Sequence, residues 1–399
     1  MSAKPLPGFR DFYPTELAER AHVMRVWREI ARRYAFVEYD GPPLEPLELY
    51  TRKSGEEIVG QLYAFTDKGG REVSLRPEMT PTFARMVAAR ANALRKPVRW
   101  FSTPQLFRYE RQQRGRLREH FQLNVDIVGE ADVTADAELL AVAIDILRAF
   151  GLGPQDVRAR TSDRRLLAAL LARVGVGEAQ LGAAYAAIDK VERDPRDVLV
   201  ERMGGAGIAA DVAARVLDLA RPTSVDALRA AHGDDAAVAE ALERFARYLA
   251  SCSALGIAEW VTLDLTIVRG LAYYTGIVFE LFDAQGTFRA ICGGGRYDNL
   301  LGALGGVDLP ALGFGMGDVV LSELLRDRGL MPSVAPAIDF WLASDDPSLL
   351  PMVQSTATLL RRVGHSVEYA LRDQSLAKQL KAADAAGARV AAIFRREAV

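Results

Sequence analysis

The sequence predicts an α+β protein in which an antiparallel sheet is interrupted by a helical insertion and followed by a small α/β unit. Residues 107–110 and 121–127 alternate apolar and polar side chains and are joined by a short loop, which indicates an antiparallel hairpin. Residues 162–255 are rich in Ala, Leu and Val with helical periodicity, which predicts an inserted helical domain. Residues 337–399 read strand, helix, strand, helix, strand, a pattern typical of an α/β unit.

Composition bounds the class of protein. The 399 residues are half hydrophobic, enough for two or three domains with a full-sized core, and the formal net charge of −2 does not indicate a nucleic-acid partner. Positive charge for such a partner would have to be local. The only two cysteines, Cys252 and Cys292, are far apart, and the four histidines are scattered. This argues against a disulfide scaffold and a metal site and predicts a reducing, cytoplasmic location.

Neither a signal sequence nor a membrane span is expected. The N-terminus lacks the charged-then-apolar pattern of a secretory signal. No apolar run approaches the roughly 18 residues that a membrane helix needs. We therefore expect no membrane partner.

The predicted hairpin combines a polar strand face with an arginine-rich loop. The apolar side of its second strand holds Phe121, Leu123, Val125 and Ile127, and the polar side holds Gln122, Asn124 and Asp126. The loop before it carries Arg111, Arg114, Arg116 and Arg118, with Gly115 able to supply a turn. Such a hairpin suits an anionic, planar ligand such as a nucleotide. The alternative is a surface hairpin whose arginines are solvated.

The hairpin also resembles a known family. Phe107-Arg108-Tyr109-Glu110-Arg111, the basic loop, and a strand with Gln122 and Asp126 are similar to motif 2 of the class II aminoacyl-tRNA synthetases, and in detail to the histidyl-tRNA synthetases. The resemblance covers about residues 5–160 and 256–394. Residues 36–49, with their Pro-rich bend, resemble motif 1, which builds the dimer interface in that family.

The resemblance implies a domain plan. The class II antiparallel-sheet catalytic domain would occupy residues 1–161 and 256–332, and the helical insertion would occupy residues 162–255. Residues 337–399 would form an α/β anticodon-binding-like domain that is short or truncated.

A strand-to-helix corner follows residues 73–79. Thr80 followed by Pro81 predicts a helix that starts with Thr80 as its cap and runs to about Leu94. The phrase Leu75-Arg76-Pro77-Glu78-Met79-Thr80 resembles the family signature L-R-P-E-x-T, in which the acidic residue helps to hold the ammonium group of the amino acid. For Thr80, a plain cap and a ligand role are both open.

Residues 260–268 alternate strictly, which predicts a strand. The chain continues as Arg269-Gly270-Leu271-Ala272-Tyr273-Tyr274-Thr275-Gly276, where Gly270 is expected to end the strand and let Arg269 turn toward a cleft. This phrase resembles the R-G-L-x-Y-Y-T-G signature of histidyl-tRNA synthetases. In that signature the Arg lies near the substrate carboxylate and the α-phosphate, and the tyrosines shape the histidine pocket. Most members carry Asp where this chain has Ala272.

Two glycine-rich phrases follow. Residues 277–281 and 288–291 predict a hairpin, and the three glycines of Cys292-Gly293-Gly294-Gly295-Arg296-Tyr297-Asp298 favour a tight turn, although the phrase also resembles the family's C-G-G-G-R-Y-D. Residues 313–317 before an apolar helix resemble motif 3. The family usually continues with Glu-Arg, whose Arg grips the γ-phosphate of ATP, where this chain has Val319 and Val320. Either another arginine substitutes, from the motif 2 loop or Arg326, or activation is lost.

The resemblance assigns site residues by position. The catalytic pair would be Arg108 and Arg269, flanking the carboxylate and the α-phosphate, because this chemistry depends on positioning and charge and needs no side-chain nucleophile. Histidine would be bound by Glu78, Met79, Thr80, Arg108, Gln122, Asp126, Arg269, Tyr273 and Tyr274. ATP would be bound by Arg108, Glu110, Arg116 and Phe121. Magnesium would bridge the phosphates, with no metal ligands from the protein.

The implied reaction is that of a histidine-tRNA ligase. L-histidine is activated with ATP to histidyl-adenylate, and the acyl group passes to the 3′ end of tRNA(His), in a homodimer. The alternative is the regulatory subunit of ATP phosphoribosyltransferase, which keeps this fold and senses histidine without charging tRNA. The absent motif 3 Arg and the short C-terminal domain favour that subunit, whereas Arg108, Arg269 and the C-terminal α/β unit favour the ligase. A generic nucleotide-binding scaffold is a third interpretation.

Overall fold

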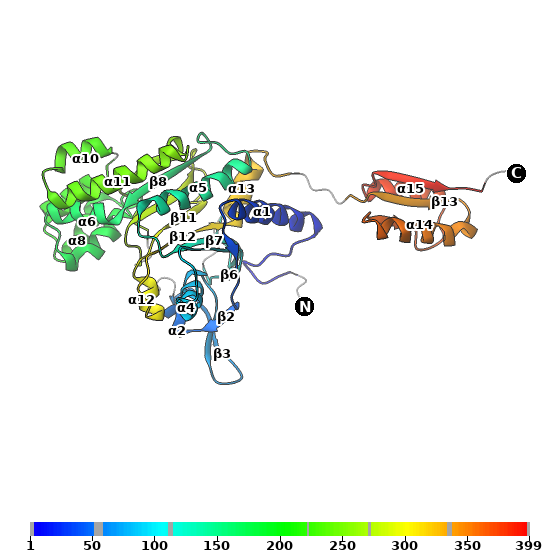
Figure 1. Ribbon diagram of the computed structural model, residues 1–399, viewed down its shortest axis with the longest axis horizontal. Coiled ribbons are helices and arrows are strands. Elements are labelled where there is room, and N and C mark those ends of the chain that lie inside the picture. The colour runs from blue at the N-terminus through cyan, green and yellow to red at the C-terminus, as the bar shows by residue number, and fades with distance from the viewer. Residues whose placement is uncertain are drawn as a thin grey trace. The chain divides into compact units, whose positions relative to one another are not determined.

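The computed structural model describes residues 4–51, 59–110, 115–221, 223–269, 273–332 and 337–396. The chain divides into two compact units. The first unit consists of Met1–Asp11 and Arg20–Met331, and the second of Phe12–Glu19 and Pro332–Val399 (Figure 1).

The first unit is built on a large sheet, to which nine strands contribute within the described residues. In spatial order they are β1 (Val37–Glu38), β5 (Val98–Ser102), β7 (Glu119–Val128), β12 (Ala311–Gly317), β11 (Cys292–Arg296), β10 (Ile277–Asp283), β8 (Val157–Asp163) and β9 (Val261–Leu263), with β6 (Gln105–Phe107) paired to β7. The pairs β1–β5 and β8–β9 at the two edges are parallel, and the other pairs are antiparallel. The predicted antiparallel core is therefore confirmed.

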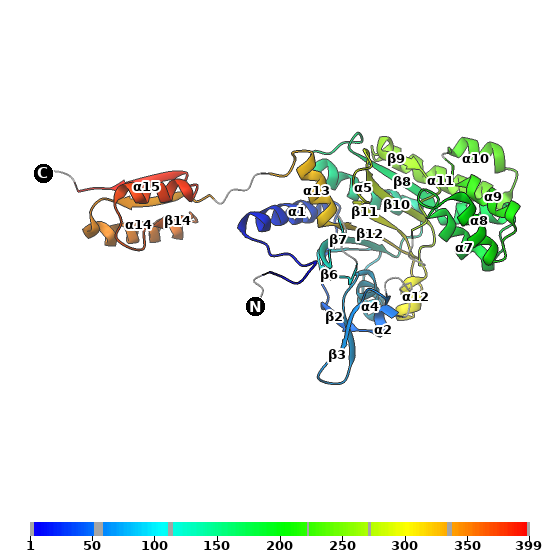
Figure 2. The same cartoon turned by 180° about the vertical axis from the view of Figure 1, so that it is seen from behind.

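Helices cover both faces of this sheet. On one face, α5 (Val133–Ala149), α13 (Asp318–Asp327) and residues 23–31 of α1 (Pro14–Arg33) pack on the apolar side of the strands, where Leu123, Val125 and Ile127 are buried (Figures 1 and 2). On the other face lie α4 (Thr80–Arg90) and α12 (Leu300–Gly305), with a smaller apolar cluster. The alternation seen in the sequence of β7 thus separates a core face from a polar face.

Helix α5 is delimited by a residue that caps its start and by a glycine after its end, and one buried ion pair holds it on the sheet. Asp132 caps it by accepting a hydrogen bond from the Thr134 N–H (3.0 Å), and Gly151 beyond it has φ +87°. Its first turn carries Asp136, which is buried and accepts from Nη2 of the buried Arg296 on β11 (2.6 Å). This pair fixes the helix to the middle of the sheet.

The strand-to-helix corner differs from the expectation by one residue. A small sheet of β2 (Leu44–Pro46), β4 (Glu72–Leu75) and β3 (Tyr63–Thr66), with α2 (Glu48–Thr51) beside β2, leads into α4. Thr80 is the first residue of α4 and not its cap, because Met79 already has helical dihedral angles (φ −95°, ψ −25°), and no side chain caps this end. The helix ends at Arg90 and not near Leu94. The Thr80 side chain is therefore not used as a cap.

The strand predicted over residues 260–268 is too long. Only Val261–Leu263 form β9, after a short 3-10 turn η2 (Ala258–Trp260). Asp264 ends the strand because its Oδ1 accepts hydrogen bonds from both the N–H (2.9 Å) and the hydroxyl (2.6 Å) of Thr266, which closes a turn. Leu265 and Val268 are buried among the helices of the insertion, whereas Ile267 belongs to a different apolar cluster, so the predicted apolar side does not stay on one face.

The glycine run is a strand and not the expected tight turn. Residues 292–296 form β11, which pairs with β10 on one side and β12 on the other, whereas residues 288–291 are not a strand. A Cβ at Gly294 would lie 2.5 Å from Cβ of Phe314, and one at Gly295 would lie 2.6 Å from the Ile277 carbonyl oxygen. The glycines therefore allow close approach of neighbouring strands.

The segment inserted between β8 and β9 is helical. It comprises α6 (Arg164–Arg173), η1 (Glu178–Gln180), α7 (Leu181–Ile188), α8 (Arg196–Gly205), α9 (Ala210–Leu219), α10 (Val225–His232) and α11 (Ala236–Ala254). These helices gather at one end of the first unit around an apolar cluster of their own (Figure 1, green). Among the described residues no single helix is long and apolar enough to cross a membrane, although the bent pair Arg164–Arg173 and Glu178–Ile188 passes that test together.

The second unit contains the α/β pattern expected at the end of the chain. Its elements are β13 (Phe340–Ser344), η3 (Pro347–Leu349), α14 (Leu350–Arg362), β14 (Val367–Tyr369), α15 (Leu376–Ala385) and β15 (Val390–Phe394). The three strands are parallel in the order β14-β13-β15, with small apolar clusters beneath the helices. The predicted order of elements is confirmed.

Candidate functional site

A cleft lies on the polar face of the large sheet. It consists of two adjoining cavities of about 600 and 330 Å³. Both are lined by Arg108, Glu110, Arg116, Gln122, Arg269 and Glu280. Because these residues come from segments before and after the helical insertion, the fold brings together side chains that are about 160 positions apart in the sequence.

Arg108 follows β6 and is held by the backbone. Its Nε donates to the Pro77 carbonyl (2.8 Å), and its own N–H donates to the Arg118 carbonyl (3.0 Å). Glu110 lies 3.9 Å from Nη1 of Arg108 and 3.0 Å from Nε of Arg116. One carboxylate thus stands between two guanidinium groups that line both cavities.

Arg269 approaches the same place from the other part of the sheet. Its backbone has φ +59°, a conformation that is uncommon outside glycine and that often marks functional sites. The turn was expected from Gly270, which lies outside the described residues, but Arg269 itself adopts the left-handed conformation. Its guanidinium pairs with Glu280 on β10 and lies 5.7 Å from the Tyr274 ring centroid. Burial opposes the charge, but Tyr274 and Glu280 outweigh it, so that the pKa of Arg269 is raised.

Gly293 on β11 makes room for this guanidinium. It lies opposite Glu280 in the β10–β11 register, and a Cβ at its position would overlap Nη1 of Arg269. The sequence offered a signal for this, because a glycine inside a strand marks close approach. The glycine run therefore serves the site by leaving room for the Arg269 side chain, and it does not form a turn.

The smaller cavity has a polar wall from the strand-to-helix corner. Glu78 is buried, and the Tyr273 hydroxyl donates to its Oε2 (3.4 Å). The rings of Tyr273 and Tyr274 lie 5.0 Å apart, and Thr80 also lines this cavity. Burial raises the pKa of Tyr273 well above its ordinary value, so its phenol is a neutral donor. Met79 does not line either cavity; it is fully buried, with its sulfur 3.9 Å from Nη1 of Arg76.

Beneath the floor of the cleft lies Asp126. Its neighbours on the polar face of β7 line the cavity, with Nε2 of Gln122 donating to Oδ1 of Asn124 (2.9 Å). Asp126 itself is 2% exposed, and the hydroxyl of Tyr297, which lines the smaller cavity, donates to its Oδ1. Burial raises the pKa of Asp126 to about 7, against the lowering effect of Tyr297. Among the described residues none donates a hydrogen bond to Oδ2.

The structure separates Phe121 from the cleft. Arg20 stacks on its ring at 4.3 Å from the centroid, and its N–H donates to Oδ1 of Asp318 (2.9 Å), so it belongs to the opposite side of β7. His120 lines the larger cavity in its place, with Nε2 3.4 Å from Oε1 of Gln122. Burial lowers the pKa of His120 to about 3, so the imidazole is neutral. Sequence reasoning missed His120, although it shares the parity of Gln122 along the strand.

Further arginines line the larger cavity. Arg116, Arg193 from the insertion and Arg289 line it, together with Val319 and Val320 of α13. Arg326 is exposed on α13 and does not line the cavity. Arg118 does not line it either, because its guanidinium stacks 4.0 Å from the Tyr109 ring centroid. The predicted positions Arg111 and Arg114 lie outside the described residues.

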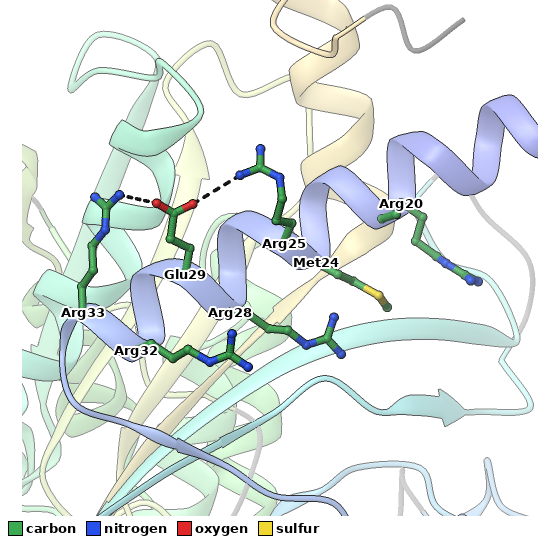
Figure 3. Close-up of a pocket in the computed structure, with 8 residues that line it drawn as sticks. Arg20, Met24, Arg25, Arg28, Glu29, Arg32 and Arg33 are labelled. Carbon is green, nitrogen blue, oxygen red and sulfur yellow. Dashed lines mark hydrogen bonds and ion pairs between the residues drawn. The ribbon is translucent and has the colours of Figure 1, made fainter. Parts of the chain in front are cut away.

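A second hollow lies on the surface of α1 (Figure 3). It measures about 710 Å³, and all of its lining residues come from this one helix, among them four arginines that form ion pairs. Glu29 pairs with Arg25 (3.3 Å) and with Arg33, and Glu38 pairs with Arg28 (2.6 Å) and Arg32 (2.9 Å). Because these cations are neutralised on an open helix surface, we place the functional site in the sheet cleft.

An antiparallel sheet whose polar face presents two arginines, one beside β6 and one after β9, defines a class II aminoacyl-tRNA synthetase catalytic domain. The family model described as histidyl-tRNA synthetase matches residues 8–318. The chain belongs to the histidyl-tRNA synthetase family.

Curated relatives agree with this assignment, and a solved structure shares the fold. The histidine–tRNA ligase of Opitutus terrae is 45% identical over 395 residues, covering 98% of this chain and 90% of that protein. The chloroplastic/mitochondrial histidine–tRNA ligase of Arabidopsis thaliana is 40% identical and covers 98% of this chain and 79% of that protein. The crystal structure of histidyl-tRNA synthetase from Nostoc sp. PCC 7120 has the same fold, with a TM-score of 0.82 at 22% identity over 98% of this chain and 91% of that chain.

Proposed function

We propose that this protein is a histidine-tRNA ligase, which activates L-histidine with ATP to histidyl-adenylate and transfers the histidyl group to the 3′ end of tRNA(His). The observation that carries the proposal is the convergence of Arg108 and Arg269 where the two cavities of the cleft join. Similarity to ligases at 40–45% identity over 98% of this chain supports it.

The first step joins two anions and therefore needs cations. The carboxylate of histidine attacks the α-phosphorus of ATP, the bond to the bridging oxygen breaks, and pyrophosphate leaves. Arg108 and Arg269 would flank the carboxylate and the α-phosphate, where fixed positive charge stabilises the transition state. Their anchors, the Pro77 carbonyl and Glu280, hold both groups in place before substrate arrives.

The smaller cavity would hold histidine. Glu78 and Thr80, with the Tyr273 hydroxyl, would bind the ammonium group, and Gln122 and Tyr274 would face the imidazole. Met79 would support this wall from the buried side, without contact.

Asp126 would act on the imidazole through Tyr297. Its Oδ2, which has no hydrogen-bond partner among the described residues, would carry the proton while the carboxyl is neutral. A pocket of this kind rejects ligands that lack the hydrogen-bonding ring, because buried polar groups would be left unpaired.

The larger cavity would hold the nucleotide. Glu110 and Arg116 would orient ATP, and the neutral ring of His120 would lie beside the base, in place of the expected Phe121. Magnesium would be carried on the phosphates. Glu110 and Glu280 are the carboxylates that line this cavity, and the described residues contain no group of three metal-ligating side chains. That donor set fits an ion that keeps water and phosphate ligands.

The second step and the assembly are also part of the proposal. The 3′ end of tRNA(His) would enter at the cleft, and two copies of the chain would form a homodimer through the segment that resembles motif 1. The two cysteines, both buried and free, are compatible with a reducing cytoplasm.

The test is ATP–pyrophosphate exchange with purified protein and each amino acid in turn, followed by charging of tRNA(His). We expect exchange with histidine alone and charging that depends on it. Histidine binding without exchange would contradict the proposal and would instead support the regulatory subunit of ATP phosphoribosyltransferase.

A further inference from the structure

Arg289 lines the larger cavity from a backbone segment that is anchored to the sheet. It belongs to the connection between β10 and β11, and its neighbours Phe288 and Ile291 are buried in the main core. The Ile291 N–H donates to the Leu281 carbonyl (2.8 Å), which anchors the backbone after it. The Arg289 side chain is exposed to solvent and lines this cavity, but not the smaller one.

The side chain of Arg289 lies close to the start of α13. A Cβ added at Gly115 would lie 3.8 Å from Cδ of Arg289 and 3.3 Å from Cγ2 of Val320. The two side chains therefore approach the same point on the loop that carries Arg116. A long side chain at position 320 would reach the volume that Arg289 occupies.

Three arginines meet the larger cavity beyond the pair Arg108 and Arg269, and one of them, Arg116, also lines the smaller cavity and pairs with Glu110 (3.0 Å). The other two are Arg193 and Arg289. Partial burial and then the neighbouring charge of Arg116 lower the pKa of Arg289, Glu110 opposes this, and Arg193 lowers it slightly further. The electrostatic repulsion between neighbouring guanidinium groups falls when an anion binds between them.

The order of the arginines along the two cavities indicates which part of a nucleotide would reach Arg289. Arg108 and Arg269 lie at the junction with the smaller cavity, and Arg289 lines only the part beyond it. A triphosphate whose α-phosphate lies between Arg108 and Arg269 would extend its outer phosphates away from the smaller cavity.

We propose that Arg289, together with Arg116, binds the terminal phosphates of the nucleoside triphosphate, and that an arginine at position 320 could do the same work. This inference rests on the proposed function and names the residue that receives the leaving pyrophosphate. The short side chain of Val320 leaves room at the start of α13, and Arg289 on the β10–β11 connection places its guanidinium there.

The test compares Arg289→Ala, Arg289→Gln and the double variant Arg289→Ala/Val320→Arg in ATP–pyrophosphate exchange without tRNA. Loss of a charged contact to phosphate at an exposed site should lower kcat/KM for ATP about tenfold in both single variants, with the KM for histidine unchanged. The double variant should recover to within about threefold of the wild type, given the shared volume. Arg326→Ala is the matched control on α13, and it should behave as the wild type.

Binding of inorganic tripolyphosphate by calorimetry gives a second readout that needs no chemistry. We expect Arg289→Ala to weaken it and the double variant to restore it, with melting temperatures close to the wild type throughout. Exchange and tripolyphosphate binding unchanged in Arg289→Ala would overturn the inference, as would a folded double variant that recovers neither. A defect confined to tRNA charging would also overturn it and assign Arg289 to RNA. If wild-type protein performs no exchange, the proposed function fails, and the tripolyphosphate series still tests Arg289.

Discussion

At the scale of single residues, alternation along β7 decides which side chains reach the cleft. The sequence pattern placed Gln122 and Asp126 on one face, and the structure has them there. Phe121 was assigned to ATP by resemblance to a motif, but the same alternation puts it on the core side and puts His120 in the cleft. Parity was the more reliable signal because backbone geometry enforces it.

His120 should matter for ATP, and Phe121 should not. We expect His120→Ala to raise the KM for ATP about tenfold in pyrophosphate exchange, since stacking of a base on an aromatic ring is worth roughly 1–3 kcal/mol. Phe121→Leu, on the other face of the strand, is the control and should leave the KM for ATP unchanged. The reverse pattern would return the base contact to Phe121.

The buried carboxyl of Asp126 should make stability depend on pH. Its folded-state pKa of about 7 lies above the ordinary value of 3.8, so between about pH 4 and 7 the folded protein keeps a proton that the unfolded chain releases. Stability is therefore lost as pH rises through this window, and the cost is complete above pH 7.

Asp126→Asn removes this titration while it keeps the shape of the side chain. The melting temperature of the variant minus that of the wild type should become more positive from pH 5 to pH 8, measured without histidine. A difference that stays constant or falls over this range would show that the carboxyl is ionised in the folded protein at neutral pH.

At the scale of elements, the errors of prediction share a physical origin. Consecutive glycines at 293–295 indicated a turn, because the sequence does not reveal that strands β10 and β12 press on both sides of them. The apolar alternation over residues 260–268 indicated a long strand, but Asp264 and Thr266 close a turn locally. In the central hairpin, the second strand β7 was predictable because its pattern is set by the nearest core. The first strand was misplaced, because β6 (Gln105–Phe107) ends before Arg108, whereas the alternation over residues 107–110 indicated a strand there.

Gly293 on β11 provides a direct test of how the strand serves the site. A methyl group at this position would overlap the guanidinium of Arg269, so Gly293→Ala should displace it and lower histidine-dependent exchange about a hundredfold. Gly302→Ala on α12, where the nearest atom to an added Cβ is 3.9 Å away, is the control and should retain activity. Full activity in Gly293→Ala would mean that the position of Arg269 is not critical.

The Arg296–Asp136 pair tests how β11 and α5 are joined. Arg296 is fully buried and also donates to the carbonyls of Glu130 (2.8 Å) and Asp132 (3.2 Å). Removal of one partner leaves a buried charge, so Asp136→Ala should destabilise the first unit by about 3–5 kcal/mol. Thermal unfolding followed by tryptophan fluorescence measures this. Arg165→Ala, which removes an exposed partner of Asp298 at 3.3 Å, should cost less than about 1 kcal/mol.

At the scale of the whole molecule, charge is distributed unevenly. The formal net charge of −2 gave no sign of an anionic ligand, yet Arg108, Arg116, Arg269 and Arg289 line one cavity of the first unit. Net charge counts every charged residue of the chain, and most arginines on the surface pair with carboxylates. It therefore does not reveal a local cluster of cations. Resemblance of short phrases located the cleft, whereas Arg289 and Gly293 emerged only from the three-dimensional arrangement.

The most direct measurement is the single-turnover rate of histidyl-adenylate formation in the full chain, for wild type, Arg108→Ala and Arg269→Ala. Each loss of a guanidinium at the reacting centre should slow this step by about 10²–10³-fold while histidine binding and the melting temperature change little. Adenylate formed at the wild-type rate in either variant would contradict the convergence of Arg108 and Arg269 on the carboxylate and the α-phosphate.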